Sequence, residues 1–166
     1  MSTLKVNTIQ NVAGAAATLA LVQVVSTQTG SVATGTTAIP WDDTIPLITD
    51  GDLYMTRTIT PTNTGNTLKI DVSGSMMTTS ASNSSGFTLF RDSDACIAGT
   101  YAFTTAYEVV RNSFTHYIFG SLGTSEISFT VRGGGVAGTF TFNGYAGATK
   151  YAGVESASIT ISEIRA

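Results

Sequence analysis

The stretch "TLKIDVS", Thr67 to Ser73, decides the fold class. Its apolar side chains, Leu68, Ile70 and Val72, stand at every second position, and polar side chains lie between them. A period of two is that of an extended strand with one buried face. The same alternation recurs in "ISFTVR" (127–132), "TFTFN" (139–143) and "SASITIS" (156–162), so we expect a chain built of β-strands.

Short strands separated by turn residues account for most of the chain. Each run is rich in threonine, β-branched or aromatic residues and ends in a segment such as "PTNTGN" or "RGGGVAG". With no convincing helical period, the pattern predicts an all-β fold, a jelly-roll β-sandwich. The Ala-rich piece Val12 to Ala20 predicts one or two helical turns. We expect strands near residues 20–26, 53–60, 67–75, 86–91, 96–101, 105–111, 114–120, 125–132, 138–143 and 156–164.

Charge is sparse for a soluble chain. Charged residues make up 11 % of the sequence, against roughly 25 % in an average soluble domain, and 29 Thr and 17 Ser fill the polar positions. Obligate interfaces are depleted in charge. The strand "FTHYIF" (114–119) is apolar on both faces, so its second face needs cover. We therefore expect other copies of the same chain to cover part of the surface.

The same composition argues against several classes of partner. Net charge is −3 and the eight Lys and Arg are scattered singly, so no patch is predicted to neutralise nucleic-acid phosphates. Cys96 is alone and predicts neither an internal disulfide nor a zinc site. The apolar run near the start is interrupted by Gln23, so we expect neither a secretory signal nor membrane insertion.

Several stretches resemble the trimeric tail-fibre and appendage proteins of tailed bacteriophages, notably phages that infect cyanobacteria and other marine bacteria. The opening "MSTLKVNTIQ" (1–10) is similar to the start of many such proteins. Other stretches resemble their compact C-terminal jelly roll: "AIPWDDTIP" (38–46), the run from Ile48 to Val72, "FTLFRDSDA" (87–95), "FTHYIFGS" (114–121), "FTVRGGG" (129–135), "GTFTFNG" (138–144) and "SASITISEI" (156–164).

The resemblance implies a homotrimer with a jelly roll of the tumour-necrosis-factor or complement type. Residues 1–20 would be a short extended N-terminal anchor that docks on other virion proteins (tail, baseplate or capsid) through Leu4, Val6 and Ile9, and residues 21–166 would form the trimeric knob. The resemblance implies a structural virion protein assembled in the host cytoplasm: a tail fibre or receptor-binding protein or, alternatively, a capsid decoration or head fibre. Candidate residues for the trimer interface are Trp41, His116, Tyr117 and Phe119.

Attachment to a host surface glycan or protein would use loops at the end of the knob away from both termini. The candidate loops are Ser80–Gly86, Asp92–Gly99 and Arg132–Gly138, and aromatic side chains would stack on sugars. Candidate receptor contacts are Asn83, Ser84, Ser85, Asp92, Asp94, Tyr101, Tyr107 and Gly134.

Two acidic pairs invite a catalytic or metal-binding interpretation. Asp42 and Asp43 are adjacent, and neighbouring side chains of an extended segment diverge, so we expect a turn anchored by Trp41 in which Asp side chains cap backbone N–H groups. Asp92 and Asp94 have the spacing of a calcium loop but lack its further ligands, which predicts a hairpin turn near Arg91. A structural cation on a trimer stays open.

The remaining polar features predict no catalytic centre. His116 is the only histidine and shares a strand with Phe114 and Ile118, which favours a buried imidazole. A three-histidine metal site at a trimer axis is the alternative. The run Arg132 to Gly138 lacks the Lys and helix of a phosphate loop. We therefore expect neither a cofactor nor an enzyme activity. The enzyme alternative is a hydrolase of surface polysaccharides.

Overall fold

The structure is a computed structural model that describes residues 20–81 and 83–166. Within them the chain forms strands and one short 3₁₀ turn, η1 (Tyr151–Gly153). The strands are β1 (Leu21–Thr29), β2 (Ala33–Gly35), β3 (Asp52–Ile59), β4 (Thr67–Thr78), β5 (Asn83–Arg91), β6 (Ala98–Thr104), β7 (Val109–Phe119), β8 (Ile127–Gly134), β9 (Phe140–Phe142) and β10 (Ala157–Ile164).

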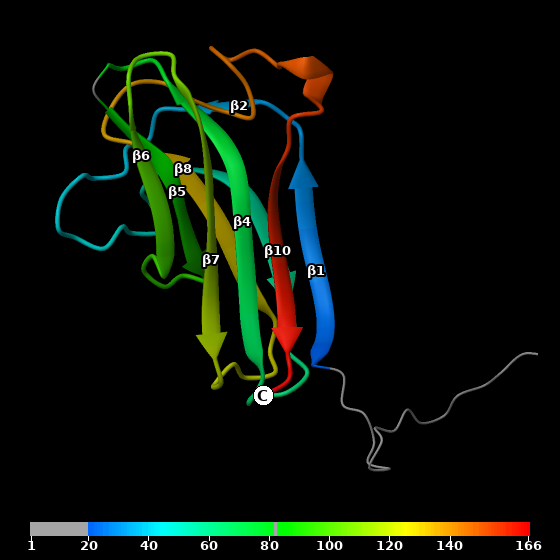
Figure 1. Ribbon diagram of the computed structural model, residues 1–166. Coiled ribbons are helices and arrows are strands. Elements are labelled where there is room, and N and C mark those ends of the chain that lie inside the picture. Colours follow the sequence, from blue (N-terminus) through cyan, green and yellow to red (C-terminus); the bar gives the residue numbers. More distant parts are fainter. Residues whose placement is uncertain (1–19, 82) are drawn as a thin grey trace, which may run out of the picture.

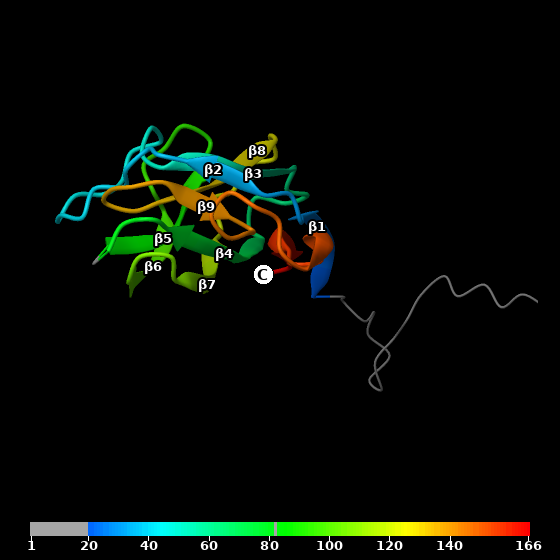
Figure 2. The ribbon, with the colours of Figure 1, turned by 90° about the horizontal axis from the view of Figure 1, so that it is seen from above.

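Two antiparallel sheets pack face to face (Figure 1). The first sheet has the order β1-β10-β4-β7, and the short strands β9 and β2 extend it beside the upper half of β4. The second sheet has the order β3-β8-β5-β6. Sequence neighbours such as β3 and β4 lie in different sheets, which is the arrangement of a jelly roll. Figure 2 shows the two layers from above. The predicted all-β jelly-roll sandwich is confirmed.

The strand predictions hold with two exceptions. The predicted runs 105–111 and 114–120 are replaced by one strand, β7, because alternation continues through the break we expected: Asn112 is buried and Ser113 is exposed. Residues 105–108 belong to the turn before it. The three-residue strand β2 was not predicted, since it is too short to show a period. The helical turns expected over Val12 to Ala20, and the docking residues Leu4, Val6 and Ile9, fall outside the described residues, apart from Ala20.

The core lies between the sheets. Leu68, Ile70 and Val72 of β4 face Phe87 and Leu89 of the second sheet, and all five side chains are at most 2 % exposed. Burying one such side chain stabilises a fold by about 1.5–3 kcal/mol. The alternation of β4 that predicts a strand therefore also selects the face that closes the sandwich.

Both described chain ends meet at one end of the sandwich. Leu21 pairs with Ile164, and Ile164 pairs with Thr67. Thr67 in turn pairs with Phe119, so β7 also ends there. We call this the terminal end. The opposite end carries the turns that follow β1, β4, β6 and β8 (Figure 1).

A buried carboxylate holds the terminal end together. Glu163 of β10 is fully buried and accepts hydrogen bonds from Gln23 of β1 (2.6 Å), from the backbone N–H and hydroxyl of Thr62 (both 2.8 Å), and from the Asn66 amide (2.6 Å). One side chain thus joins the first strand, the β3–β4 connection and the last strand. Burial raises the pKa of Glu163, but these hydrogen bonds outweigh it and hold the pKa below the ordinary value.

We predict that Glu163→Gln destabilises the fold by about 1–3 kcal/mol, because an amide –NH₂ would face donors that need an acceptor. The folded-state pKa lies below the unfolded-state value. The stabilisation is therefore complete above the unfolded-state pKa and is lost as the pH falls through the folded-state pKa. Urea unfolding from pH 7 downward measures both effects.

The matched control is Glu126→Gln, which removes an exposed carboxylate for which the described chain supplies no partner. The control should unfold like the wild type at every pH. If Glu163→Gln and the control had the same urea midpoint of unfolding at pH 7, the stabilising role of the Glu163 hydrogen bonds would be contradicted.

Candidate binding site

The segment from Thr37 to Leu47 crosses the outer face of the second sheet. Asp52 fixes its start, since the carboxylate accepts hydrogen bonds from the Thr37 N–H (2.9 Å) and hydroxyl (2.8 Å). The Ile39 N–H donates to the carbonyl of Gly135 just beyond β8 (2.9 Å), and the Cys96 N–H donates to the Pro46 carbonyl (3.0 Å). The segment is thus tied down at both ends and leaves a span between them.

Trp41 sits in this span and rests on two aromatic side chains of β6. Its ring centroid lies 4.4 Å from that of Tyr101 and 4.9 Å from that of Phe103, both edge to face. All three remain open to solvent, at 48, 60 and 64 % exposure respectively. We call Trp41, Tyr101 and Phe103 the aromatic ridge. Since isolated exposed aromatics are ordinary but a contiguous group is not, the ridge is a candidate binding surface.

Asp42 closes a turn beside the ridge, as the sequence predicted. One carboxylate oxygen, Oδ1, accepts hydrogen bonds from the Thr44 N–H (2.9 Å) and from the Thr44 hydroxyl. These bonds lower the pKa of Asp42, the hydroxyl contributing most. Within residues 20–81 and 83–166, no protein donor reaches the second oxygen, Oδ2. The neighbouring Asp43 is exposed.

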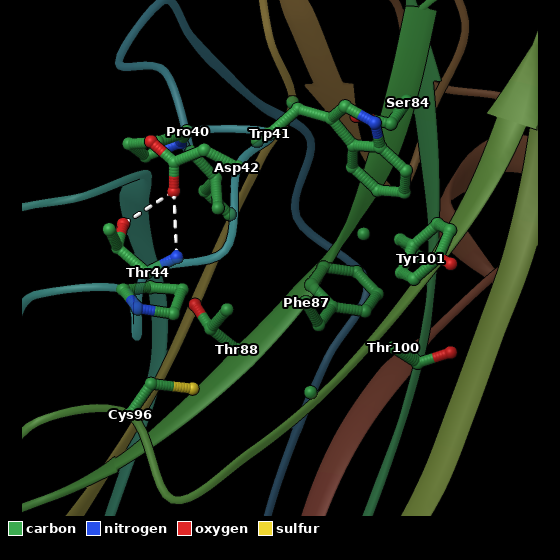
Figure 3. Close-up of a pocket in the computed structure, with 16 residues that line it drawn as sticks. Pro40, Trp41, Asp42, Thr44, Ser84, Phe87, Thr88, Cys96, Thr100 and Tyr101 are labelled. Atoms are coloured by element: carbon green, nitrogen blue, oxygen red, sulfur yellow. Dashed lines mark hydrogen bonds between the residues drawn. The ribbon is translucent and has the colours of Figure 1, made fainter.

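A pocket of about 270 Å³ opens beneath Trp41. The crossing segment forms one wall and strands β5 and β6 form the other (Figure 3). Trp41 and Tyr101 border it, and Asp42, Thr44 and Thr88 bring polar groups to it. Cys96 also lines the pocket, where burial raises the pKa of its thiol and Sγ donates to the Ala98 carbonyl (3.1 Å). A protonated thiol is a poor nucleophile.

Metal and membrane features are not found in the part of the chain that the structure describes. Over that part, no three His, Cys, Asp or Glu side chains gather closely enough to hold a metal ion. Nor does any helix there have the length and hydropathy of a membrane span.

Several predicted receptor contacts are buried. Ser85 is fully buried and Ser84 is 4 % exposed, because the expected loop Ser80–Gly86 is largely the start of β5. Gly134 ends β8 beneath the crossing segment, where a Cβ would lie 2.7 Å from the Thr37 carbonyl oxygen. The sequence predicted that Ser85 and Gly134 contact a receptor directly, but the structure buries both residues. Asn83 begins β5.

The other expected loops also need correction. Asp92 and Asp94 form the predicted turn after Arg91: the Asp94 N–H donates to the Arg91 carbonyl (2.9 Å), and Asp92 accepts from the Ser128 N–H (2.9 Å). This turn lies at the terminal end, not away from it, because β5 runs toward that end. The run Arg132–Gly138 is strand as far as Gly134.

Tyr107 does lie at the far end, in the β6–β7 turn. It is half exposed, and its ring centroid is 6.3 Å from that of Tyr145. Lys150 lies over the Tyr145 ring at 5.2 Å. These contacts make a second, smaller aromatic group.

The four candidate interface residues separate into three places. Tyr117 and Phe119 stack on the outer side of β7, 44 and 76 % exposed, with ring centroids 5.8 Å apart. His116 pairs with the core residue Ile70 and therefore lies on the inner side of β7, where burial lowers its pKa. Trp41 belongs to the opposite sheet. A three-histidine metal site stays a prediction, although His116 does not lie on the outer face.

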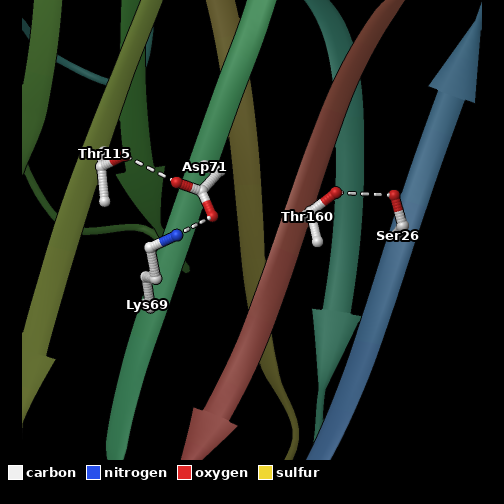
Figure 4. Close-up of polar contacts among 5 residues, drawn as sticks. All are labelled: Ser26, Lys69, Asp71, Thr115 and Thr160. Atoms are coloured by element: carbon white, nitrogen blue, oxygen red, sulfur yellow. Dashed lines mark hydrogen bonds and ion pairs between the residues drawn. The ribbon is translucent and has the colours of Figure 1, made fainter.

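The outer face of the first sheet carries hydroxyl groups from several strands, some of which Figure 4 shows. Asp71 of β4 binds the Lys69 ammonium (2.7 Å) and the Thr115 hydroxyl of β7 (2.6 Å). Ser26 of β1 and Thr160 of β10 are joined through their hydroxyls at 2.9 Å. Burial raises the pKa of Asp71, but the hydrogen bonds from Lys69 and Thr115 prevail and lower it. Most polar groups on this face are thus paired with each other.

Sequence reasoning missed Phe103 and the way Trp41 and Tyr101 come together. The signal for Phe103 was available, because it stands two residues after Tyr101 and so shares its face of a strand. The contact with Trp41 spans 60 residues of chain and depends on the crossing segment, which no local pattern reveals.

Comparisons with known proteins give no family. No family model matches the chain, and no curated protein matches it. Among solved structures, infectious bursal disease virus Gx strain is 14 % identical with a TM-score of 0.43 over 86 % of this chain and 36 % of that chain. The VP2 subviral particle of the same virus is 10 % identical with a TM-score of 0.41, over 86 % and 39 %. Dimeric latent PorU from Porphyromonas gingivalis is 11 % identical with a TM-score of 0.41, over 95 % and 14 %.

These likenesses are too distant to carry an argument about function. The chain spans less than two-fifths of each of these three neighbours. What the protein does must be inferred from its own surfaces.

We predict that acrylamide quenches the fluorescence of the native, assembled protein efficiently. Trp41 is the only tryptophan, so the emission comes from one site, and its indole is half exposed. Stern–Volmer titration before and after unfolding in urea gives the measurement. Strong protection in the native state would show that another subunit covers Trp41.

Proposed function

We propose that this protein is a homotrimeric structural protein of a tailed-phage particle, acting as a short tail fibre or receptor-binding knob that attaches to the host cell surface. The sequence resemblance to phage fibres supports this assignment, and the jelly-roll sandwich is compatible with it. The observation that carries the proposal is that the sandwich presents two different outer faces. One is suited to packing against copies of itself, and the other bears an open aromatic pocket.

The outer face of the first sheet is the proposed contact between subunits. Many of its side chains are Ser or Thr, and Lys69, Asp71 and Thr115 bond to one another, so covering them leaves few groups without partners. Tyr117 and Phe119 add a large apolar area at the edge of this face. Aromatic residues are enriched at interfaces and charged residues are depleted in their centres. The low overall charge of the chain fits the same arrangement.

The second sheet would then face outward from the trimer. Its aromatic ridge and pocket stay free, because they lie on the side of the sandwich opposite Tyr117 and Phe119. Three equal pockets per trimer would bind a repetitive surface with avidity, even if each contact were weak. We assign Trp41 to this outward face rather than to the subunit contact.

The trimer makes a direct prediction for the aromatic pair. Phe119→Asp should shift the protein from trimer to monomer, because a carboxylate would be buried without a partner at the contact. Sedimentation equilibrium gives the mass, and circular dichroism checks that each variant keeps its β-sheet signal. Tyr151→Ala, which removes an 82 % exposed ring from η1, is the control and should stay trimeric. A folded wild-type monomer would refute the assembly.

Attachment is tested with the soluble wild-type protein. Fluorescently labelled protein should bind host cells and should block adsorption of the phage whose particle carries it. Absence of both effects would remove the receptor-binding role. Electron microscopy of gold-labelled particles then places the protein. Label on the tail supports a fibre, whereas many copies at capsid axes would favour a capsid decoration or head fibre.

A further inference from the structure

We propose that the pocket beneath Trp41 binds a single neutral pyranose ring of a surface glycan. The apolar face of the sugar lies against the aromatic ridge, and Asp42 accepts hydrogen bonds from sugar hydroxyls. This inference rests on the proposed attachment role and names its ligand and site. It differs from that role in being specific to one face, one pocket and one class of sugar.

The size of the pocket limits the occupant. Pockets for drug-sized ligands measure about 300–1,000 Å³, and this one measures about 270 Å³. A single sugar ring fits that volume, while an oligosaccharide or a folded peptide element does not. Trp41 and Tyr101 line the pocket and are themselves exposed to solvent, so neighbouring sugars of a longer chain would extend outward past the ridge.

The ridge supplies the apolar half of the contact. Trp41 and Tyr101 stand nearly perpendicular, with an interplanar angle of 78°, and form two adjoining walls. One face of a pyranose ring carries several C–H groups, which are weakly positive and poorly hydrated. The faces of aromatic rings are negative, so the two surfaces attract each other. The rings also have few rotatable bonds, so holding them in place costs little conformational entropy.

Asp42 supplies the polar half. Its Oδ1 is committed to Thr44, which fixes the carboxylate in the turn, and its Oδ2 has no donor in the described chain. A carboxylate is a strong acceptor, and its hydrogen bonds from hydroxyls are shorter and stronger than those of a neutral group. Thr88 brings a hydroxyl group to the same pocket. The arrangement therefore suits a ligand with several adjacent hydroxyls and one apolar face.

Charge narrows the class of sugar. Among residues 20–81 and 83–166, no Lys, Arg or His lines the pocket. Asp42 lies in its wall, and Asp43 is next in the chain. A uronic or sialic acid would bring its own carboxylate toward this negative charge without a cation to offset it. Neutral pyranosides are therefore the predicted ligands.

The single tryptophan makes the site its own reporter. Wild-type protein is titrated with methyl glycosides of glucose, galactose, mannose and N-acetylglucosamine, and with methyl glucuronide as the acidic member. We expect at least one neutral glycoside to shift the Trp41 emission to the blue, because the sugar displaces water from the indole. Methyl glucuronide should give no shift. No response to any neutral glycoside, or a response only to the acidic one, would overturn the proposal.

Variants are compared by saturation-transfer NMR, which needs no tryptophan. Trp41→Ala and Tyr101→Ala should each weaken binding of the responding sugar at least tenfold. Asp42→Asn, which keeps an oxygen for the Thr44 turn, should weaken it severalfold. Tyr151→Ala removes an equally large ring outside the pocket and should bind like the wild type. Unchanged binding in both ridge variants would place the sugar elsewhere and refute the site.

Cell binding by the same variants separates this inference from the attachment role. Wild-type binding to host cells that survives in Trp41→Ala and Tyr101→Ala would refute the pocket and leave attachment standing. Loss of trimer mass in Trp41→Ala would instead mean that a second copy of the chain occupies the pocket, and would also refute it. Joint loss of sugar and cell binding in a trimeric variant supports it.

Discussion

The alternation of side chains along β4 is the constraint on which the rest of the structure depends. Leu68, Ile70 and Val72 must point inward to close the sandwich against the second sheet, and this forces Lys69 and Asp71 outward. A register slip of one residue would exchange the two sets. Because β4 pairs with both β10 and β7, its inner face organises the core and its outer face sets the chemistry of the first sheet. Core and surface are thus fixed together.

The two outer faces differ because different elements cover them. The first sheet keeps its own strands at the surface, so its outer face shows short hydroxyl side chains and one Lys69–Asp71 pair. The second sheet is crossed by the segment that carries Trp41, which adds a wall and creates a pocket that the strands alone would not have. Under the proposed function, the first sheet would serve assembly and the second sheet would serve recognition.

The sequence predicts the sandwich well and the site only in part. Strands such as β4, β8 and β10 follow from alternation, and the Asp42 turn follows from the tendency of aspartate to cap its own backbone. Ser85 is buried because it shares the inner face of β5 with Phe87. The burial of Gly134 could not be predicted, because it depends on Thr37 and Ile39, far away in the chain, crossing over it. The same long-range contact joins Trp41 to Tyr101. The alternation of side chains predicts which face of each strand is apolar, but it does not predict which distant segment covers that face.

The central claim is that copies meet through the first sheet and leave the second sheet open. Electron cryomicroscopy of the purified assembly tests it most directly. The account predicts three copies, with Tyr117 and Phe119 buried between subunits and the pocket beside Trp41 open to solvent. A monomer, or an assembly in which Trp41 is buried at the contact while the outer face around Asp71 is exposed, would contradict it.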